Sequence, residues 1–444
     1  MIEQRIEEVL EPASPLSRRS ILSFGALLAL GACAPRGIAT ASGPRYDWTL
    51  RPAADAGMSE AGLEAVRAAV QKQIDAGVIN GAVSAIARRG KLVWYEAQGF
   101  GNPIDKTPMR KDAIFRVMSS SKPVTAVAIL TLVDEGKLSL DDKVSKYIPS
   151  FANPRVAVSA PGNTDPAKVK IVPATRELVI RDLLTHTSGI TSVGDKMMPG
   201  PASLVNRIER LPGETLESYI PRIGPAVLQF QPGSKFSYSP LDALDTALYI
   251  VQLVSGRPAD VYMQERIFAP LEMVDTYYNV PAAKQSRIVD IYATKDGKWQ
   301  AVDHILGPGP YKYISGGGGI FSTAHDFMNF EIMLLNRGSF NGRRIMRPET
   351  HALMHRNVVG SLFADWFPPI TKGNGFGLGV RIAESADNLN GRSIGAYGWG
   401  GAYGTESWVE PALDLAGVFF IQMNPPPASA SVNFEKAARA AIVG

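Results

Sequence analysis

The sequence has a single cysteine, Cys33, among its 444 residues. One cysteine excludes an intrachain disulfide and any zinc or iron–sulfur site that needs several cysteines. The sequence also lacks a block of charges of one sign. Its 46 Lys and Arg and its 42 Asp and Glu are spread along the chain. The resulting net charge of +4 is weak evidence for nucleic acid binding.

What the chain does contain is the composition of a globular protein with a large core. Hydrophobic residues make up 45% and charged residues 20%, which excludes a disordered chain and a collagen. An amphipathic helix is expected over 59–76, and two strands joined by a glycine turn are expected within 81–99. Near the other end, strands over 406–409 and 415–423 precede a helix over 433–443.

Between these two ends, from about 150 to 300, the signals are helical and rich in loops and prolines. We therefore predict an α+β fold with an antiparallel sheet flanked by helices. The sheet domain would be built from both chain ends, 48–150 and 300–444, with a mostly helical inserted domain over 151–299.

The N-terminus carries the pattern of an export signal. An arginine pair at 18–19 precedes an apolar stretch over 24–32 that is too short to span a bilayer, which resembles a twin-arginine signal. The Leu-Gly-Ala that precedes Cys33 resembles a lipobox, in which the cysteine is acylated after cleavage. The sequence thus predicts a signal peptide over 1–32, lipidation at Cys33 and a tether over 33–47, with the protein periplasmic or membrane-anchored.

One feature of this segment argues against export. Four glutamates and one arginine precede residue 17, whereas the first part of an export signal is normally positive. The alternative is a leader with a chance arginine pair on a cytoplasmic protein.

An S-x-x-K motif, Ser119 to Lys122, lies at the start of a helix expected over 119–135. Pro123 fixes this start, because proline clashes with the carbonyl four residues back and is tolerated only in a first turn. The free N–H groups and the positive dipole end there favour a developing alkoxide or oxyanion. Lys122 shares a helix face with Ser119, where a buried lysine can accept or relay the serine proton.

Alone, S-x-x-K also fits a helix cap followed by a solvated lysine. Three further segments follow it in order: 180–189 (IRDLLTHTSG), 232–239 (PGSKFSYS) and 398–404 (GWGGAYG). With them the chain, over about 50–440, resembles the serine β-lactamase and penicillin-binding-protein family. Within the class C-like branch it is most similar to the family VIII carboxylesterases. The resemblance implies the fold of the β-lactamases and a reaction that passes through an acyl-enzyme on serine.

By this resemblance, Ser119 is the nucleophile, and Tyr238 with Lys122 is the base for the serine and the acid for the leaving group. The backbone N–H groups of Ser119 and Ala402 are implied as the oxyanion hole. Residues 239–242 (Ser-Pro-Leu-Asp) have the pattern of a capping box, which predicts that Tyr238 lies in the loop just before a helix. The alternative is a tyrosine that packs its ring at a domain seam.

Two positions depart from the β-lactamase pattern. Trp399, Gly400 and Gly401 stand where β-lactamases have Lys-Thr-Gly, and we expect them to bind substrate from an edge strand. Pro240 stands where many members have the asparagine that contacts a lactam amide. The loss of the lysine cation and of the amide favours neutral esters.

Other candidates have structural interpretations. His186 is expected to be a buried turn histidine, and the glycines of 315–319 to serve close backbone packing, since this segment lacks the Lys-Ser/Thr of a phosphate loop. His351 and His355 could share a metal, but no third ligand is evident. Aromatic residues that could line an acyl pocket, or fill a core instead, are Tyr311, Tyr313, Trp366, Phe367 and Tyr403.

These inferences predict a serine hydrolase that cleaves short-chain carboxylic esters through an acyl-enzyme, without a metal or organic cofactor. Its partner would be a small-molecule ester, with no nucleic acid and with membrane contact only through a lipid on Cys33. The alternatives are a β-lactamase or D-amino-acid peptidase, an acyltransferase, and a catalytically inactive envelope-binding protein. The intact Ser119, Lys122 and Tyr238 argue against the last of these.

Overall fold

The computed structural model describes residues 46–192, 200–303, 309–363, 366–367 and 371–444. All of them belong to one unit, 39–444, and the predicted signal peptide, Cys33 and the tether as far as residue 45 lie outside the described residues. Within the described ranges, no helix has both the length and the apolar composition of a membrane span.

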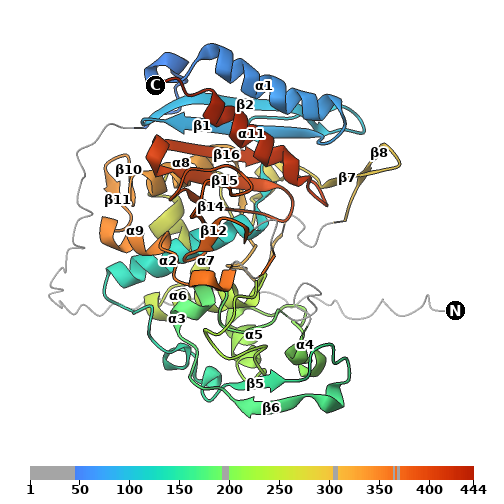
Figure 1. Cartoon of the computed structure of the whole chain (residues 1–444), viewed down its shortest axis with the longest axis vertical. Coiled ribbons are helices and arrows are strands. Elements are labelled where there is room, and N and C mark those ends of the chain that lie inside the picture. The colour runs from blue at the N-terminus through green and yellow to red at the C-terminus, as the bar shows by residue number, and fades with distance from the viewer. Residues whose placement is uncertain (1–45, 193–199, 304–308, 364–365, 368–370) are drawn as a thin grey trace, which may run out of the picture. The chain divides into compact units, whose positions relative to one another are not determined.

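An eight-stranded antiparallel sheet joins the two ends of the chain (Figure 1). The hairpin expected from the sequence is present, with β1 (Gly81–Arg88) and β2 (Lys91–Asn102) joined through Arg89 and Gly90. On its other side β1 pairs with β16 (Leu415–Phe420). The strand order is β12-β13-β14-β15-β16-β1-β2-β3, in which the other bounds are β3 (Thr107–Pro108), β12 (Asn374–Phe376), β13 (Arg381–Ala383), β14 (Tyr397–Gly400) and β15 (Thr405–Glu410). The predicted α+β fold, with a sheet built from both chain ends, is confirmed.

Helices cover both faces of this sheet, and the side chains of β16 alternate between them. Phe419 packs into the core formed with α1 (Glu60–Asp75) and α11 (Ala428–Ala440), whereas Phe420 belongs to the core on the face that carries α8 (Ala324–Leu335). α11 begins five residues before its predicted start, because the small residues ahead of 433 continue the helix and bury Ala430.

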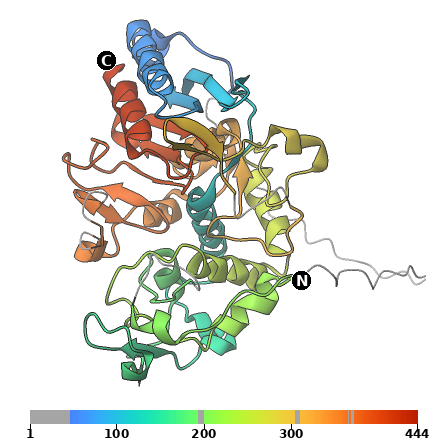
Figure 2. The ribbon, with the colours of Figure 1, turned by 90° about the vertical axis from the view of Figure 1, so that its right-hand side faces the viewer.

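The region between the two halves of the sheet is rich in short helices and loops. Its helix α6 (Asp242–Ser255) is buried from Asp242 to Val251 and packs against α2 (Ser121–Asp134), which Figure 2 shows in teal between the sheet and the helical region. The predicted boundary at 299/300 falls inside β8 (Lys298–Ala301). The remaining elements are η1 (Ala53–Ala56), β4 (Phe115–Arg116), η2 (Met118–Ser120), η3 (Val144–Lys146), η4 (Pro149–Phe151), β5 (Arg155–Val158), η5 (Pro166–Lys168), β6 (Lys170–Pro173), α3 (Ile180–Leu184), α4 (Pro201–Val205), α5 (Leu216–Ile223), α7 (Ala259–Met263), η6 (Gln264–Phe268), η7 (Ala282–Arg287), β7 (Tyr292–Lys295), β9 (Phe321–Ser322), β10 (Ser339–Phe340), β11 (Arg343–Arg344), α9 (Pro348–Met354), η8 (Gly360–Phe363) and η9 (Pro411–Leu413).

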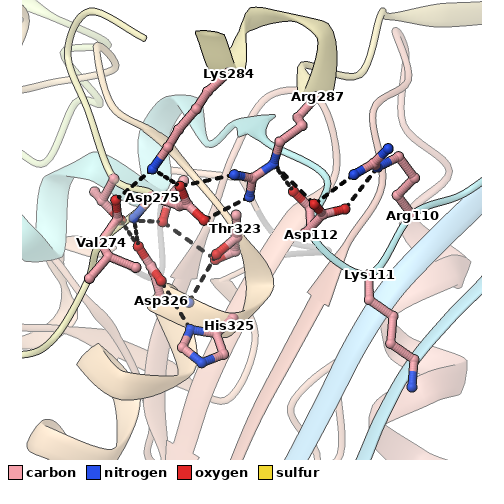
Figure 3. Close-up of polar contacts among 12 residues, drawn as sticks. Arg110, Lys111, Asp112, Val274, Asp275, Lys284, Arg287, Thr323, His325 and Asp326 are labelled. Carbon is pink, nitrogen blue, oxygen red and sulfur yellow. Dashed lines mark hydrogen bonds and ion pairs between the residues drawn. The ribbon is translucent and has the colours of Figure 1, made fainter. Parts of the chain in front are cut away.

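A network of charged side chains ties η7 and the start of α8 to the segment before β4 (Figure 3). Arg287 pairs with Asp275 at 2.7 Å and with Asp112 at 3.3 Å, and Lys284 pairs with Asp275 at 2.6 Å. The buried carboxylate of Asp326 accepts a hydrogen bond from the backbone N–H of Asp275 at 2.6 Å. Since these carboxylates are already paired, the network holds the fold together and offers no free ligand.

Candidate active site

Ser119 lies in a single 3₁₀ turn, η2, that runs directly into α2. The regular helix therefore begins at Ser121, two residues later than predicted, and Pro123 still lies in its first turn. Met118 has a φ of +47°, in the left-handed region that residues other than glycine rarely adopt. Backbone strain of this kind often marks functional sites, and here it lies next to the predicted nucleophile.

The three predicted catalytic side chains meet at one hydroxyl oxygen. The phenol of Tyr238 donates a hydrogen bond to Ser119 Oγ at 2.7 Å, and Lys122 Nζ donates to the same oxygen at 3.0 Å. Lys122 Nζ also lies 4.9 Å from the centre of the Tyr238 ring. Because Ser119 and Tyr238 are 119 residues apart in sequence, it is the fold that brings them together.

Lys122 is completely buried, and its Nζ has two further acceptors. These are the backbone carbonyls of Pro240, at 2.5 Å, and Gly317, at 2.6 Å. A lysine ammonium has three N–H donors, and each of them has an acceptor here. A buried charge is stable only when its polar atoms are hydrogen-bonded, and this condition is met here. The three acceptors therefore hold the Lys122 ammonium beside the oxygens of Ser119 and Tyr238.

Asp245 fixes the backbone that supplies one of those carbonyls. Its carboxylate accepts hydrogen bonds from the Ser315 hydroxyl at 2.6 Å, from the Gly317 N–H at 2.9 Å and from the Tyr313 hydroxyl at 2.7 Å. Complete burial raises the pKa of the Asp245 carboxyl, while these hydrogen bonds and the charge of Lys122 oppose that rise. Asp245 therefore positions the Gly317 carbonyl that binds Lys122.

The glycines of 315–319 allow this segment to lie directly against α6. A Cβ on Gly316 would stand 2.6 Å from the carbonyl oxygen of Leu244, and one on Gly317 would stand 2.8 Å from that of Pro240. Real Cβ atoms essentially never approach other atoms so closely. The prediction that these glycines serve close backbone packing is confirmed.

His186 lies against the ring of Tyr238, with their ring centres 4.6 Å apart. Its Nδ1 accepts a hydrogen bond from the Ser239 N–H at 3.2 Å, and its own carbonyl accepts one from the Ser237 N–H at 3.0 Å. Burial, with a contribution from Lys122, holds the pKa of His186 well below its usual value, so the ring is neutral. The prediction of a buried turn histidine is confirmed, and its contacts hold the backbone on both sides of Tyr238.

The predicted capping box at 239–242 is wrong. Helix α6 begins at Asp242, and Pro240 precedes it with its carbonyl turned to Lys122. The Ser192 hydroxyl accepts hydrogen bonds from the N–H groups of Leu241 and Asp242, at 3.2 Å each, and so caps the helix from another segment. No local pattern in the sequence indicates this role of Ser192.

The turn that carries Ala402 is held by a hydrogen bond to Val117, two residues before Ser119. The Thr405 hydroxyl donates to the carbonyl of Val117 at 2.9 Å, and a Cβ on Gly401 would collide with that same carbonyl oxygen. Ala402 follows β14 in an exposed turn. This placement is compatible with the expected pair of backbone donors, Ser119 and Ala402, which stays a prediction.

β14 is an interior strand, which corrects the edge strand expected from the sequence. Its neighbour β13 is short, however, and pairs only with Tyr397 and Gly398. Trp399 and Gly400 therefore extend beyond β13, so the end of β14 resembles an edge locally.

Trp399 belongs to an aromatic cluster around Tyr238. Its ring centre lies 5.6 Å from that of Tyr238 and 5.3 Å from that of Phe376, and it is 8% exposed. Trp366 packs on Tyr238 as well, at 5.5 Å. Trp399, at the position of the lysine in the lactamase pattern, thus places an aromatic ring beside Tyr238 instead of a cation.

A pocket of about 580 Å³ opens beside the turn that carries Ser119. Of the aromatic residues considered for an acyl pocket, Tyr311 and Tyr313 line it, whereas Trp366, Phe367 and Tyr403 do not. Its lining residues are Met118, Arg210, Leu211, Pro212, Gly213, Glu214, Leu241, Tyr278, Pro310, Tyr311, Lys312, Tyr313, Ile314, Ser315, Gly318 and Gly319.

The histidine pair near the end of α9 has structural contacts. His351 Nε2 lies 2.8 Å from the Tyr397 hydroxyl, and His355 stacks on the Tyr397 ring at 4.6 Å. Among the residues that the structure describes, no group of three or more His, Cys, Asp or Glu side chains is arranged to hold a metal.

Comparisons with known proteins agree with this geometry. The family model described as Beta-lactamase matches residues 66–442. An uncharacterized protein of Mycobacterium tuberculosis is 32% identical over 374 residues, covering 82% of this chain and 90% of that protein. Esterase EstB of Burkholderia gladioli is 30% identical over 365 residues, covering 76% of this chain and 84% of the esterase. The solved structure of EstCE1, described as a hydrolase with promiscuous acyltransferase activity, has a TM-score of 0.71 and 25% identity, covering 87% of this chain and 99% of its own.

Proposed function

The chain belongs to the Beta-lactamase family, and on that premise we propose that it is a serine hydrolase of short-chain carboxylic esters, with an acyl-enzyme on Ser119. The observation that carries the proposal is the meeting of Tyr238 and Lys122 at Ser119 Oγ, at 2.7 and 3.0 Å. The similarity to Esterase EstB supports ester chemistry on this fold.

In the proposed reaction Tyr238 acts as a phenolate, which takes the proton of Ser119 as the Ser119 oxygen attacks the ester carbonyl and so becomes the neutral phenol. The Lys122 cation, held by two carbonyls that can only accept, stabilises the phenolate before this transfer. The backbone N–H groups of Ser119 and Ala402 would bind the oxyanion. Tyr238 then returns the proton to the leaving alcohol, and water releases the acyl group in a second, equivalent pair of steps. None of these steps requires a metal or an organic cofactor.

Substrate choice is the first prediction. A β-lactam presents a carboxylate and a side-chain amide, but Trp399 and Pro240 offer neither a cation nor an amide. Losing one charge-assisted and one neutral hydrogen bond forfeits roughly 2 to 4 kcal/mol, or about 30-fold to 1,000-fold in transition-state binding. We expect rapid hydrolysis of p-nitrophenyl acetate or butyrate, a decline with long alkyl chains, and slow turnover of a chromogenic cephalosporin at best.

The two substrate classes should be measured on the same enzyme preparation, with kcat/KM as the readout. A kcat/KM on the cephalosporin comparable to that on the best ester would show that Trp399 and Pro240 do not disfavour lactams. The β-lactamase or peptidase alternative would then take the place of the esterase.

Asp245 provides the second prediction. An asparagine there can accept hydrogen bonds from only part of the set Tyr313, Ser315 and Gly317, so the Gly317 carbonyl should shift away from Lys122. We expect Asp245→Asn to lower kcat by about 10-fold to 100-fold with little change in KM, because small displacements of catalytic groups have effects of this size.

Tyr313→Phe is the matched control for this variant. It removes one donor to Asp245 but leaves the hydrogen bond from Gly317, so kcat should stay near that of the unaltered enzyme. Equal losses of kcat in both variants, or a change confined to thermal stability, would contradict a positioning role for Asp245.

Acyl transfer is the second candidate function. EstCE1 is described as a hydrolase with promiscuous acyltransferase activity, and the same acyl-enzyme would serve both reactions. An alcohol in place of water at the second step would then yield a new ester.

Export and lipid attachment at Cys33 also remain proposals, because this part of the sequence lies outside the described residues. The proposed partner is a small-molecule ester, and a membrane would be contacted only through that lipid.

A further inference from the structure

The pocket beside Met118 is larger than a short acyl group needs. A butyryl group has about five heavy atoms, and at about 30 Å³ each, the volume of a water molecule in the liquid, it would fill about a quarter of the pocket's 580 Å³. Pockets of about 300 to 1,000 Å³ typically enclose whole small molecules. The pocket therefore has room for a larger acyl group than those of the usual test substrates.

The character of the pocket changes with distance from Ser119. Next to the nucleophile it is formed by Met118, Leu241 and Gly318, which are apolar or lack a side chain. The tyrosines at 278, 311 and 313 form part of the wall. Its exposed lining residues include two cations, Arg210 and Lys312.

Arg210 is held in place by a cation–π contact that leaves its N–H groups unused. Its guanidinium lies 4.3 Å from the centre of the Tyr313 ring, and that ring is fixed because its hydroxyl donates to Asp245 at 2.7 Å. Among the described residues, Arg210 makes no ion pair or hydrogen bond. The planar N–H groups of the guanidinium are therefore available to a ligand.

The acidic residue that lines the pocket does not neutralise Arg210 by pairing with it. One oxygen of Glu214 accepts the Leu211 N–H at 2.6 Å, and the other pairs with Arg222. Lys312 is less informative, because it also borders a neighbouring pocket lined by Glu217 and Asp260. Of the two cations that line the pocket, Arg210 is thus the one whose position is fixed by a ring contact.

From these observations we propose that the pocket receives an acyl group that ends in a carboxylate, which Arg210 binds. The inference rests on the proposed function and names the substrate class of the same site. A guanidinium binds a carboxylate through two parallel hydrogen bonds, the geometry for which arginine is best suited. Neither Ser119 nor Tyr238, the proposed donor to the leaving alcohol, nor residues 399–402 line the pocket, so the acyl side is assigned on Met118, the neighbour of Ser119, in its wall. A neutral alkyl end at the same place would desolvate Arg210 without a partner, in keeping with the expected decline for long alkyl chains.

The test compares two substrates of equal length, mono-4-nitrophenyl adipate and methyl 4-nitrophenyl adipate, which differ only in a terminal carboxylate or its methyl ester. We expect kcat/KM for the acid-ended ester to exceed that of the capped ester by about tenfold, mostly through KM, because a hydrogen bond to a charged group has about this effect. Since Arg210 is exposed, added salt should reduce the preference.

Two variants identify the anchor. Arg210→Met should remove the preference, read as the ratio of kcat/KM for the two adipates, whereas Lys312→Met should retain most of it. Equal kcat/KM on the two adipates, a preference that survives in Arg210→Met, or an equal loss in both variants would overturn the inference while butyrate hydrolysis upholds the proposed function. If neither adipate nor butyrate is hydrolysed and Ser119 takes no covalent label, the proposed function fails and the inference falls with it.

Discussion

Replacing Ser119 with alanine should reduce ester hydrolysis to the background rate and leave the fold intact. The reason is that Tyr238 and Lys122 converge on the hydroxyl of Ser119, at 2.7 and 3.0 Å from its Oγ. Two measurements check this result: the release of 4-nitrophenol from p-nitrophenyl butyrate, and the mass added by a fluorophosphonate probe. Both should be lost, while circular dichroism and the thermal unfolding midpoint stay close to those of the unaltered protein.

Ser121→Ala is the matched control, because Ser121 is a serine two residues further along the same segment. Its hydroxyl accepts the Ile320 N–H at 3.2 Å, on the far side of the segment from the proposed reaction. This variant should keep both the label and most of the activity. Retained turnover and labelling in Ser119→Ala would refute the assignment of the nucleophile.

The second large effect concerns the proton-transfer pair. Lys122→Ala and Tyr238→Phe should each lower kcat by about 10²-fold or more, because general acid–base groups typically contribute 10²-fold to 10⁴-fold. The two residues act on one oxygen and contact each other, at 4.9 Å from Nζ to the ring centre. The loss in the double variant should therefore be much smaller than the product of the two single losses.

Tyr262→Phe serves as the control for a tyrosine that only stabilises the fold. Its hydroxyl lies 2.8 Å from that of Thr131, on the buried side of α2. Its kcat should be unchanged. Small losses in Lys122→Ala and Tyr238→Phe that multiply fully in the double variant would favour a packing role for both.

How far the sequence could predict this site depends on how local each interaction is. Ser119 and Lys122 are three residues apart at a helix start, so their spacing and Pro123 place both on one face. Tyr238 was predicted through a family resemblance, since it lies 119 residues away and no periodicity links it to Ser119. Part of the sheet was also predictable from a local pattern. Strands β1 and β2 are neighbours in sequence and are joined by a turn that contains a glycine.

The parts that the sequence did not predict are contacts between distant segments. Asp245 was not singled out, because its role appears only when residues 313–317 lie across α6. The cap of α6 was misassigned for a similar reason. Pro240 must direct its carbonyl to Lys122, so the helix starts later and Ser192 supplies the acceptor from 49 residues away.

The departures from the lactamase pattern could be recognised in the sequence, but their surroundings could not. Trp399 was expected at the edge of the sheet, whereas it packs against Tyr238 and Phe376 at the end of an interior strand. The unpaired guanidinium of Arg210 could not be foreseen either, because it depends on the position of Tyr313.

Covalent attachment of an acyl group to Ser119 is the most direct test of the proposed reaction. The enzyme is mixed with p-nitrophenyl butyrate, quenched in acid within the first turnover, digested, and its peptides are analysed by mass spectrometry. The geometry at Ser119 Oγ predicts one butyryl group on Ser119, and no such adduct in Ser119→Ala. Release of 4-nitrophenol with the butyryl group on another residue, or with Ser119 unmodified throughout the first turnover, would contradict it.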